Sequence, residues 1–153
     1  MHKILFKTVN EGAPEEAIAA LEERFRIRLP QELKEFYRQH NGAVFSPGAL
    51  SSPERCQLCY FYPIGQRDQE NFPLSIDQLL EWQKMDNLIP MCYVPFCEDE
   101  AGNSYYVRVD QEGYGEIHYI VDFLDNDCIE GTGLAAGSFA EFMDKVAGTV
   151  EDR

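Results

Sequence analysis

Positive charge is scarce in this sequence. It contains 13 lysine and arginine residues against 27 aspartate and glutamate residues, which gives a formal net charge of −14. A field of this sign repels the phosphates of nucleic acids and anionic lipid head groups, because both are negatively charged. Nucleic acid and membrane surfaces are therefore poor candidate partners. A basic protein or a metal cation would instead be attracted.

Long hydrophobic runs are also missing. No stretch approaches the roughly 18 consecutive apolar residues typical of a transmembrane helix. Polar residues from Thr8 onward interrupt the first apolar run, so we expect no signal peptide. The five cysteines are Cys56, Cys59, Cys92, Cys97 and Cys128. Because their number is odd and thiols stay reduced in chains that are not exported, we expect a cytoplasmic protein with free thiols.

The motifs of common catalytic sites are absent as well. The sequence has no Gly-x-Ser-x-Gly element, P-loop or Gly-x-Gly-x-x-Gly loop. Its three histidines, His2, His40 and His118, are scattered. Carboxylates are so abundant that an acid–base pair stays open as an alternative, but nothing singles one out. We therefore predict no catalytic residues, no cofactor and no enzymatic activity.

Four segments carry the signals of helix starts. Pro14 and Pro30 suit the first helical turn, where a missing N–H costs nothing, and acidic residues follow both. Ser75 and Ser138 each precede a glutamine or glutamate by three residues, the pattern of a capping box. The predicted helices run from Pro14 to near Arg26, from Pro30 to Asn41-Gly42, from Ser75 to about Met85, and from Ser138 to Gly148.

Between the helices, short apolar and aromatic runs predict strands at 58–64, 91–96, 104–109 and 116–123, whereas 43–57 resembles a loop. Short turns between consecutive strands favour an antiparallel meander over βαβ units. The predicted fold class is α+β. We expect a single-domain antiparallel β-meander sheet on which two N-terminal helices, a middle helix and a C-terminal helix pack.

Four motifs follow one another in an order that resembles a known superfamily. They are Ile27-Arg28-Leu29-Pro30 with Asn41-Gly42; Ile64-Gly65 with the Ser75–Leu80 helix; the Val94–Tyr106 hairpin; and Ser138-Phe139-Ala140-Glu141-Phe142. In this arrangement the sequence is similar to the SUKH superfamily of fungal Smi/Knr-type cell-wall regulators and bacterial immunity proteins. The resemblance covers roughly residues 14–147. The segment from Ser46 to Cys59 departs from it by being longer and richer in serine and proline.

The resemblance implies an antiparallel sheet carrying helices, without catalytic residues. Bacterial members act as immunity proteins, often against nuclease or other enzyme toxins, and fungal members are regulatory adaptors. We therefore expect one SUKH-like domain over 1–153, with its core at about 14–147, that neutralises a bacterial toxin by direct binding. Two alternatives stay open: a regulatory adaptor without a toxin partner, and a small metal-binding protein or enzyme.

Acidic residues cluster in one part of the sequence. Ten of them lie between Glu98 and Glu130, opposed only by Arg108. The predicted partner-binding residues are Glu98, Asp99, Glu100, Asp122, Asp125, Asp127 and Glu130. Complementary charge speeds encounter with a basic protein and selects it among partners. The alternative is a solvated face that serves solubility alone.

Two metal sites are weaker alternatives. The carboxylates Asp122, Asp125, Asp127 and Glu130 are close in sequence but do not match the twelve-residue calcium loop of an EF-hand. Cys56 and Cys59 have the spacing of a zinc knuckle, which would need Cys92 and Cys97 as further ligands. We predict no metal. The paired tyrosines Tyr105 and Tyr106 lie in a predicted strand, where alternation should turn one of them outward.

Overall fold

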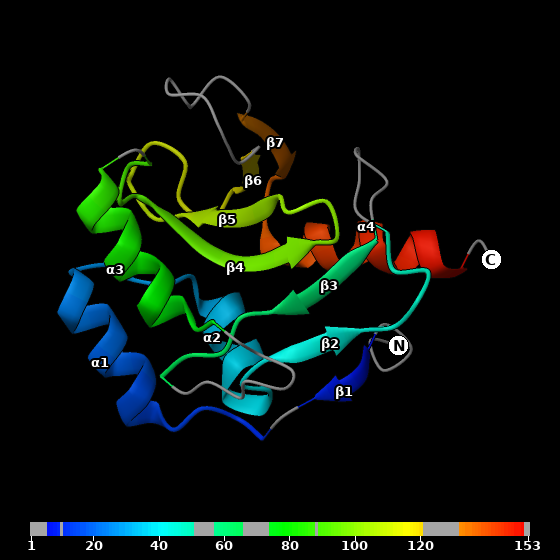
Figure 1. The fold of residues 1–153 in the computed structure, drawn as a ribbon, viewed down its shortest axis with the longest axis horizontal. Helices are drawn as coiled ribbons and strands as arrows, with labels where there is room; N and C mark the ends of the chain where they lie inside the picture. The colour runs from blue at the N-terminus through cyan, green and yellow to red at the C-terminus, as the bar shows by residue number, and fades with distance from the viewer. Residues whose placement is uncertain are drawn as a thin grey trace.

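The computed structural model describes residues 6–9, 11–50, 57–65, 74–87, 89–120 and 132–151. In these ranges the chain forms one seven-stranded antiparallel sheet, whose strands are ordered as in the sequence, and four helices (Figure 1). The strands are β1 (Phe6–Val9), β2 (Ala43–Phe45), β3 (Leu58–Phe61), β4 (Tyr93–Asp99), β5 (Ser104–Arg108), β6 (Ile117–Ile120) and β7 (Thr132–Ala136). The helices are α1 (Glu15–Phe25), α2 (Gln31–Gln39), α3 (Ile76–Asp86) and α4 (Phe139–Glu151). The predicted α+β meander is confirmed.

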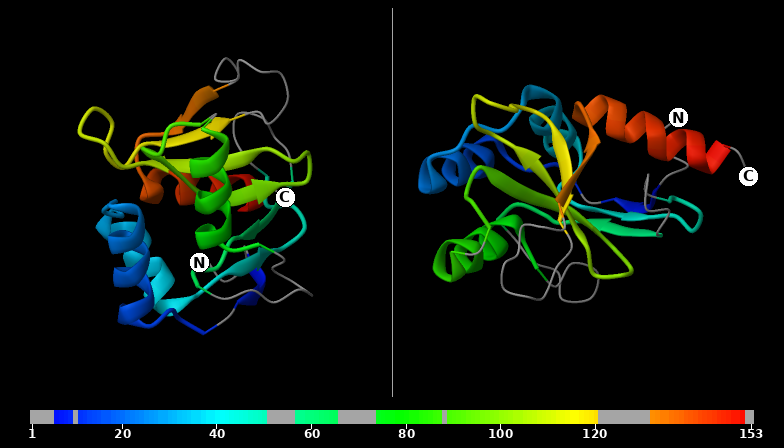
Figure 2. Two further views of the ribbon diagram at one scale, coloured as in Figure 1. Left: turned by 60° about the vertical axis from the view of Figure 1, so that its left-hand side comes forward. Right: turned by 90° about the horizontal axis from the view of Figure 1, so that it is seen from above.

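Helices cover both faces of the sheet. Seen from above, α1, α2 and α4 lie on one side of the strands and α3 lies on the other (Figure 2). Phe61 of β3 is central to the first interface, with ring centroids 4.6 Å from Phe36 of α2 and 6.0 Å from Phe139 of α4. Each fully buried phenylalanine contributes about 1.5–3 kcal/mol through removal of apolar surface from water. The main core is thus aromatic and lies between the sheet and α2 and α4.

The four predicted helix starts are confirmed to within one residue. Pro14 and Pro30 are the N-caps of α1 and α2, and the Ser75 hydroxyl accepts a hydrogen bond from the Gln78 N–H at 3.2 Å. The Ser138 hydroxyl accepts the equivalent bond from the Glu141 N–H at 3.1 Å. The last helix, however, continues past the predicted stop at Gly148 to Glu151. An isolated glycine costs a helix only about 1 kcal/mol, which neighbouring turns can offset.

Several strands differ from the sequence prediction. β2 lies inside 43–57, which was predicted to be a loop, and neither β1 nor β7 was predicted. β2 has only three residues, and it forms because β1 and β3 both pair with it. Such a strand depends on partners distant in sequence, which local pattern does not reveal. β4 also continues to Asp99, three residues past the predicted end of the 91–96 strand.

The expectation that either Tyr105 or Tyr106 points outward is wrong. Their side chains do face opposite sides of β5, but both are buried, at 0% and 8% exposure. Tyr105 packs against Phe142 of α4, with ring centroids 5.5 Å apart. Tyr106 is the ladder partner of Pro95 and lies on the α3 side. Alternation therefore holds, but helices cover both faces of the sheet.

The end of α2 is fastened to the chain that leaves β3. The Tyr37 hydroxyl donates to the Tyr62 carbonyl at 2.6 Å. The buried Asn41 amide donates to the Ile64 carbonyl at 2.9 Å, and its oxygen accepts from the Ile64 N–H at 2.7 Å. Gly12 lies against the same helix end, where a Cβ atom would come within 1.7 Å of the Arg38 carbonyl oxygen. The Asn-Gly element predicted to stop the helix therefore also joins two distant segments.

We expect Asn41→Ala to destabilise the protein by about 2–4 kcal/mol. The change leaves the buried N–H and carbonyl of Ile64 without the side chain that satisfies them, and each such group costs about 1–3 kcal/mol. Urea unfolding followed by circular dichroism measures the difference. Gln31→Ala, on an exposed residue of α2, should change the stability by less than about 0.5 kcal/mol. Equal effects of the two variants would contradict this account.

Candidate functional site

The acidic turn between β4 and β5 is held together by one of its own carboxylates. Asp99 is 1% exposed, and one of its oxygens accepts hydrogen bonds from the backbone N–H groups of Ala101 and Asn103, each at 3.0 Å. Gly102 completes the turn with a φ of 90°, which suits glycine. Asp99 was predicted to contact a partner. Its carboxylate instead shapes the turn, so we leave it out of the candidate surface.

Glu98 and Glu100 are the acidic residues that this turn presents. Glu100 is exposed, while Glu98 is half-buried and accepts a hydrogen bond from the Tyr62 hydroxyl at 2.6 Å. Among the described residues, neither glutamate has an ion-pair partner. We call Glu98 and Glu100 the hairpin acids. Of the other predicted contact residues, Asp122, Asp125, Asp127 and Glu130 lie outside the described residues.

The single cation of the acidic stretch is already paired. Arg108 donates to Asp110 at 2.7 Å and to Glu112 at 3.1 Å. The hydrogen bonds between Arg108 and Asp110 raise the pKa of the guanidinium and lower the pKa of the carboxyl. Arg108 therefore does not neutralise the hairpin acids, and its ion pairs lie at the other end of β5 from Ser104.

The charge of Glu98 affects two neighbouring tyrosines. Burial raises the pKa of Tyr60 to about 12, with the nearby Glu98 carboxylate adding to the increase. Burial raises the pKa of Tyr62 still further, again with a contribution from Glu98. Both phenols are therefore neutral at physiological pH, and Tyr62 donates to the carboxylate. Glu98 is held in place by this contact. The backbone N–H of Glu100 donates to the Gln57 carbonyl, and no hydrogen bond or ion pair of the Glu100 side chain is found within the described residues.

The cysteines of the described residues do not form a metal site. Cys97 is fully buried in the sheet, and burial raises the pKa of its thiol well above the usual value. Burial also raises the pKa of Cys59 and of Cys92. A protonated thiol is a poor metal ligand and a poor nucleophile. No three ligand-type side chains cluster within the part of the chain that the structure describes; Cys56 and Cys128 lie outside it.

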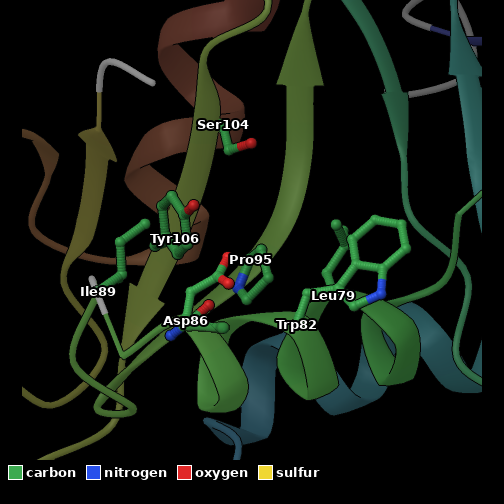
Figure 3. Close-up of a pocket in the computed structure, with 8 residues that line it drawn as sticks. Leu79, Trp82, Asp86, Ile89, Pro95, Ser104 and Tyr106 are labelled. Atoms are coloured by element: carbon green, nitrogen blue, oxygen red, sulfur yellow. The ribbon is translucent and has the colours of Figure 1, made fainter. Parts of the chain in front are cut away.

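A groove between α3 and the sheet is a second candidate site, which the sequence pattern does not predict. Figure 3 shows its walls, with Leu79 and Trp82 on α3 and Pro95, Ser104 and Tyr106 on β4 and β5. Its volume is about 220 Å³. Trp82 is 46% exposed, which is unusual for the largest side chain in the molecule. The sequence offered one signal for this site, a tryptophan within the predicted helix from Ser75 to about Met85.

Together these features define a class of protein: an α+β domain with a meander sheet, a negative surface and a shallow aromatic groove. A comparison with protein families identifies the family of the chain. Residues 12–145 match the SMI1/KNR4 family (SUKH-1), so the chain belongs to this family, as its sequence motifs indicated. No curated protein matches the chain. Proteins of the family are in general non-catalytic and serve as protein-binding modules in immunity or regulation.

Among the helices that the structure describes, none is both long enough and apolar enough to cross a bilayer.

We expect Glu98→Gln to lower the pKa of Tyr60 from about 12, without restoring it to its ordinary value, because burial is the larger cause. Between about pH 10 and pH 12 the unfolded state loses the Tyr60 proton while the folded state keeps it. The neutral Tyr60 therefore contributes a stability that is fully present below about pH 10 and is lost as the pH rises through about 12. NMR titration of ring-labelled tyrosine measures the shift. Glu100→Gln should leave this pKa unchanged, and an equal shift in both variants would contradict the assignment.

Proposed function

We propose that this protein is a bacterial, cytoplasmic immunity protein that binds a basic toxin domain through the hairpin acids and so neutralises it. The observation that carries the proposal is that Glu98 and Glu100 have no cationic partner among the residues that the structure describes, on a chain of net charge −14. Family membership supports a protein-binding role at a coarser level. The predicted contacts of Asp122, Asp125, Asp127 and Glu130 belong to the same proposal.

The physical basis is electrostatic complementarity. Enzymes that act on nucleic acids carry cationic grooves for the phosphate backbone, and a negative surface can occupy such a groove. The long-range field increases the association rate, while close contacts determine the specificity. Screening limits the attraction to about 8 Å at physiological salt, so the hairpin has to dock directly. Inhibition by occlusion requires no catalytic group in the immunity protein.

A salt-dependent pull-down tests the binding surface. We expect the tagged protein to retain a basic protein from native lysate at low salt and to lose it as salt rises. The double variant Glu98→Lys/Glu100→Lys should retain at most about a tenth as much of the basic protein, because both charge reversals turn attraction of the partner into repulsion. Glu23→Lys/Glu35→Lys is the matched control, since it changes the net charge from −14 to −10 as well, on exposed helix positions. Equal loss in both variants would show that total charge, and not the hairpin, governs binding.

A growth assay separates immunity from the adaptor alternative. The retained partner is expressed in a host cell with and without the protein. An immunity protein should restore growth that the partner suppresses, and the hairpin double variant should fail to do so. A partner that does not affect growth, yet binds equally well, would favour a regulatory adaptor.

A further inference from the structure

The groove beside α3 has an apolar floor and walls of fixed geometry. Pro95 and Tyr106 are ladder partners on β4 and β5, and they form the floor. The Gln83 side chain anchors α3 above them by donating to the carbonyls of Pro90, at 3.0 Å, and Tyr93, at 2.8 Å. Trp82, one residue before this anchor, therefore stands at a defined position on the rim (Figure 3).

One carboxylate lines the groove, and a second lies next to one of its lining residues. Asp86 lines one end and is the last residue of α3, where the helix dipole adds negative potential. Ser104 lines the groove on β5, and its ladder partner is Glu98. The Tyr62 hydroxyl joins the two, lying 3.2 Å from the Ser104 hydroxyl and 2.6 Å from Glu98. Lys84 belongs to the same helical turn as Asp86 but does not line the groove.

We propose that this groove receives an arginine side chain, flanked by apolar residues, from a protein partner. The guanidinium would stack on the Trp82 ring and face Asp86, while its aliphatic stem and the flanking residues cover Leu79 and Pro95. The proposal rests on the proposed function, since the same basic partner would supply the arginine. In this proposal the groove is a second contact for the partner, next to the hairpin acids. Tyr62 connects the two sites, because its hydroxyl contacts both Glu98 and Ser104.

Arginine fits this groove better than lysine. Its planar group stacks on aromatic rings and loses its hydration more readily than an ammonium group. Tryptophan is the strongest aromatic partner for a cation. A purely apolar occupant would make no favourable electrostatic contact with the Asp86 carboxylate or with the carbonyl end of α3. An acidic occupant would be repelled by both.

The single tryptophan of the chain makes the groove directly observable, because all tryptophan fluorescence comes from Trp82. The probe is an acetylated and amidated peptide that alternates leucine and arginine. We expect it to change the emission of Trp82 in a saturable manner, with weaker binding at high salt. A peptide with glutamine or glutamate in place of arginine should bind at least about tenfold more weakly. The lysine peptide should be intermediate.

Variants locate the contact. Asp86→Asn should weaken the binding of the arginine peptide about threefold, as expected for an exposed charge pair. Asp144→Asn is the matched control, with the same chemical change at an exposed position of α4 on the other face of the sheet. Trp82→Ala should weaken binding about tenfold by calorimetry. Trp82→Phe keeps an aromatic ring, so its affinity for the peptide should lie between those of the unchanged protein and Trp82→Ala. Binding by Trp82→Phe would show that the weaker binding of Trp82→Ala does not come from a general loss of folding.

Four outcomes would overturn the proposal. The first is unchanged Trp82 emission with the arginine peptide, and the second is equal binding of the arginine, glutamine and glutamate peptides. The third is an equal effect of Asp86→Asn and Asp144→Asn, which would mean attraction by net charge alone. The fourth is self-association, measured by sedimentation and abolished by Trp82→Ala, which would make a second copy of the chain the occupant.

The same variants separate this proposal from the proposed function. If Trp82→Ala and Asp86→Asn retain the basic partner in the pull-down while Glu98→Lys/Glu100→Lys does not, only the groove assignment is wrong. If the arginine peptide binds as expected but the hairpin double variant still retains and neutralises the partner, the hairpin assignment is wrong and the groove stands.

Discussion

The buried connection between α2 and the segment after β3 is the contact on which the remaining structure depends. Asn41 binds both polar backbone groups of Ile64, and Tyr37 binds the carbonyl of Tyr62. These bonds place α2 across the sheet, where Phe36 meets Phe61. They also fix Tyr62, whose hydroxyl holds Glu98. A chain of direct contacts thus runs from the Asn-Gly motif to the candidate surface.

Covering both faces of the sheet has a consequence for binding. The space between the sheet and helices α2 and α4 is filled by aromatic core residues. On the other face, α3 crosses the strands and leaves a groove beside Trp82. The hairpin acids lie at the end of the two strands that form the groove floor. Both candidate sites therefore belong to one part of the molecule, although they come from separate segments of the chain.

The main helices and the meander could be predicted because their signals are local. Proline and serine at helix starts, and short turns between aromatic runs, act within a few residues. The missed strands β1 and β2 have only four and three residues, and β7 is rich in glycine and alanine, which are weak strand formers. All three strands depend on neighbours for their hydrogen bonds. The prediction for Tyr105 and Tyr106 failed for a related reason: alternation tells which sides residues face, but not whether a helix covers those sides.

The sequence by itself determined the family, the α+β class and the strong negative charge, because order of motifs, local propensity and composition need no coordinates. Tertiary structure alone decided which acidic residues are available to a partner. Three neighbours in sequence have three different roles: Glu98 is held by a tyrosine, Asp99 is buried within its turn, and Glu100 is exposed. It also placed Trp82 opposite Tyr106 across the groove. Exposure and juxtaposition arise from packing between distant segments, which no local pattern encodes.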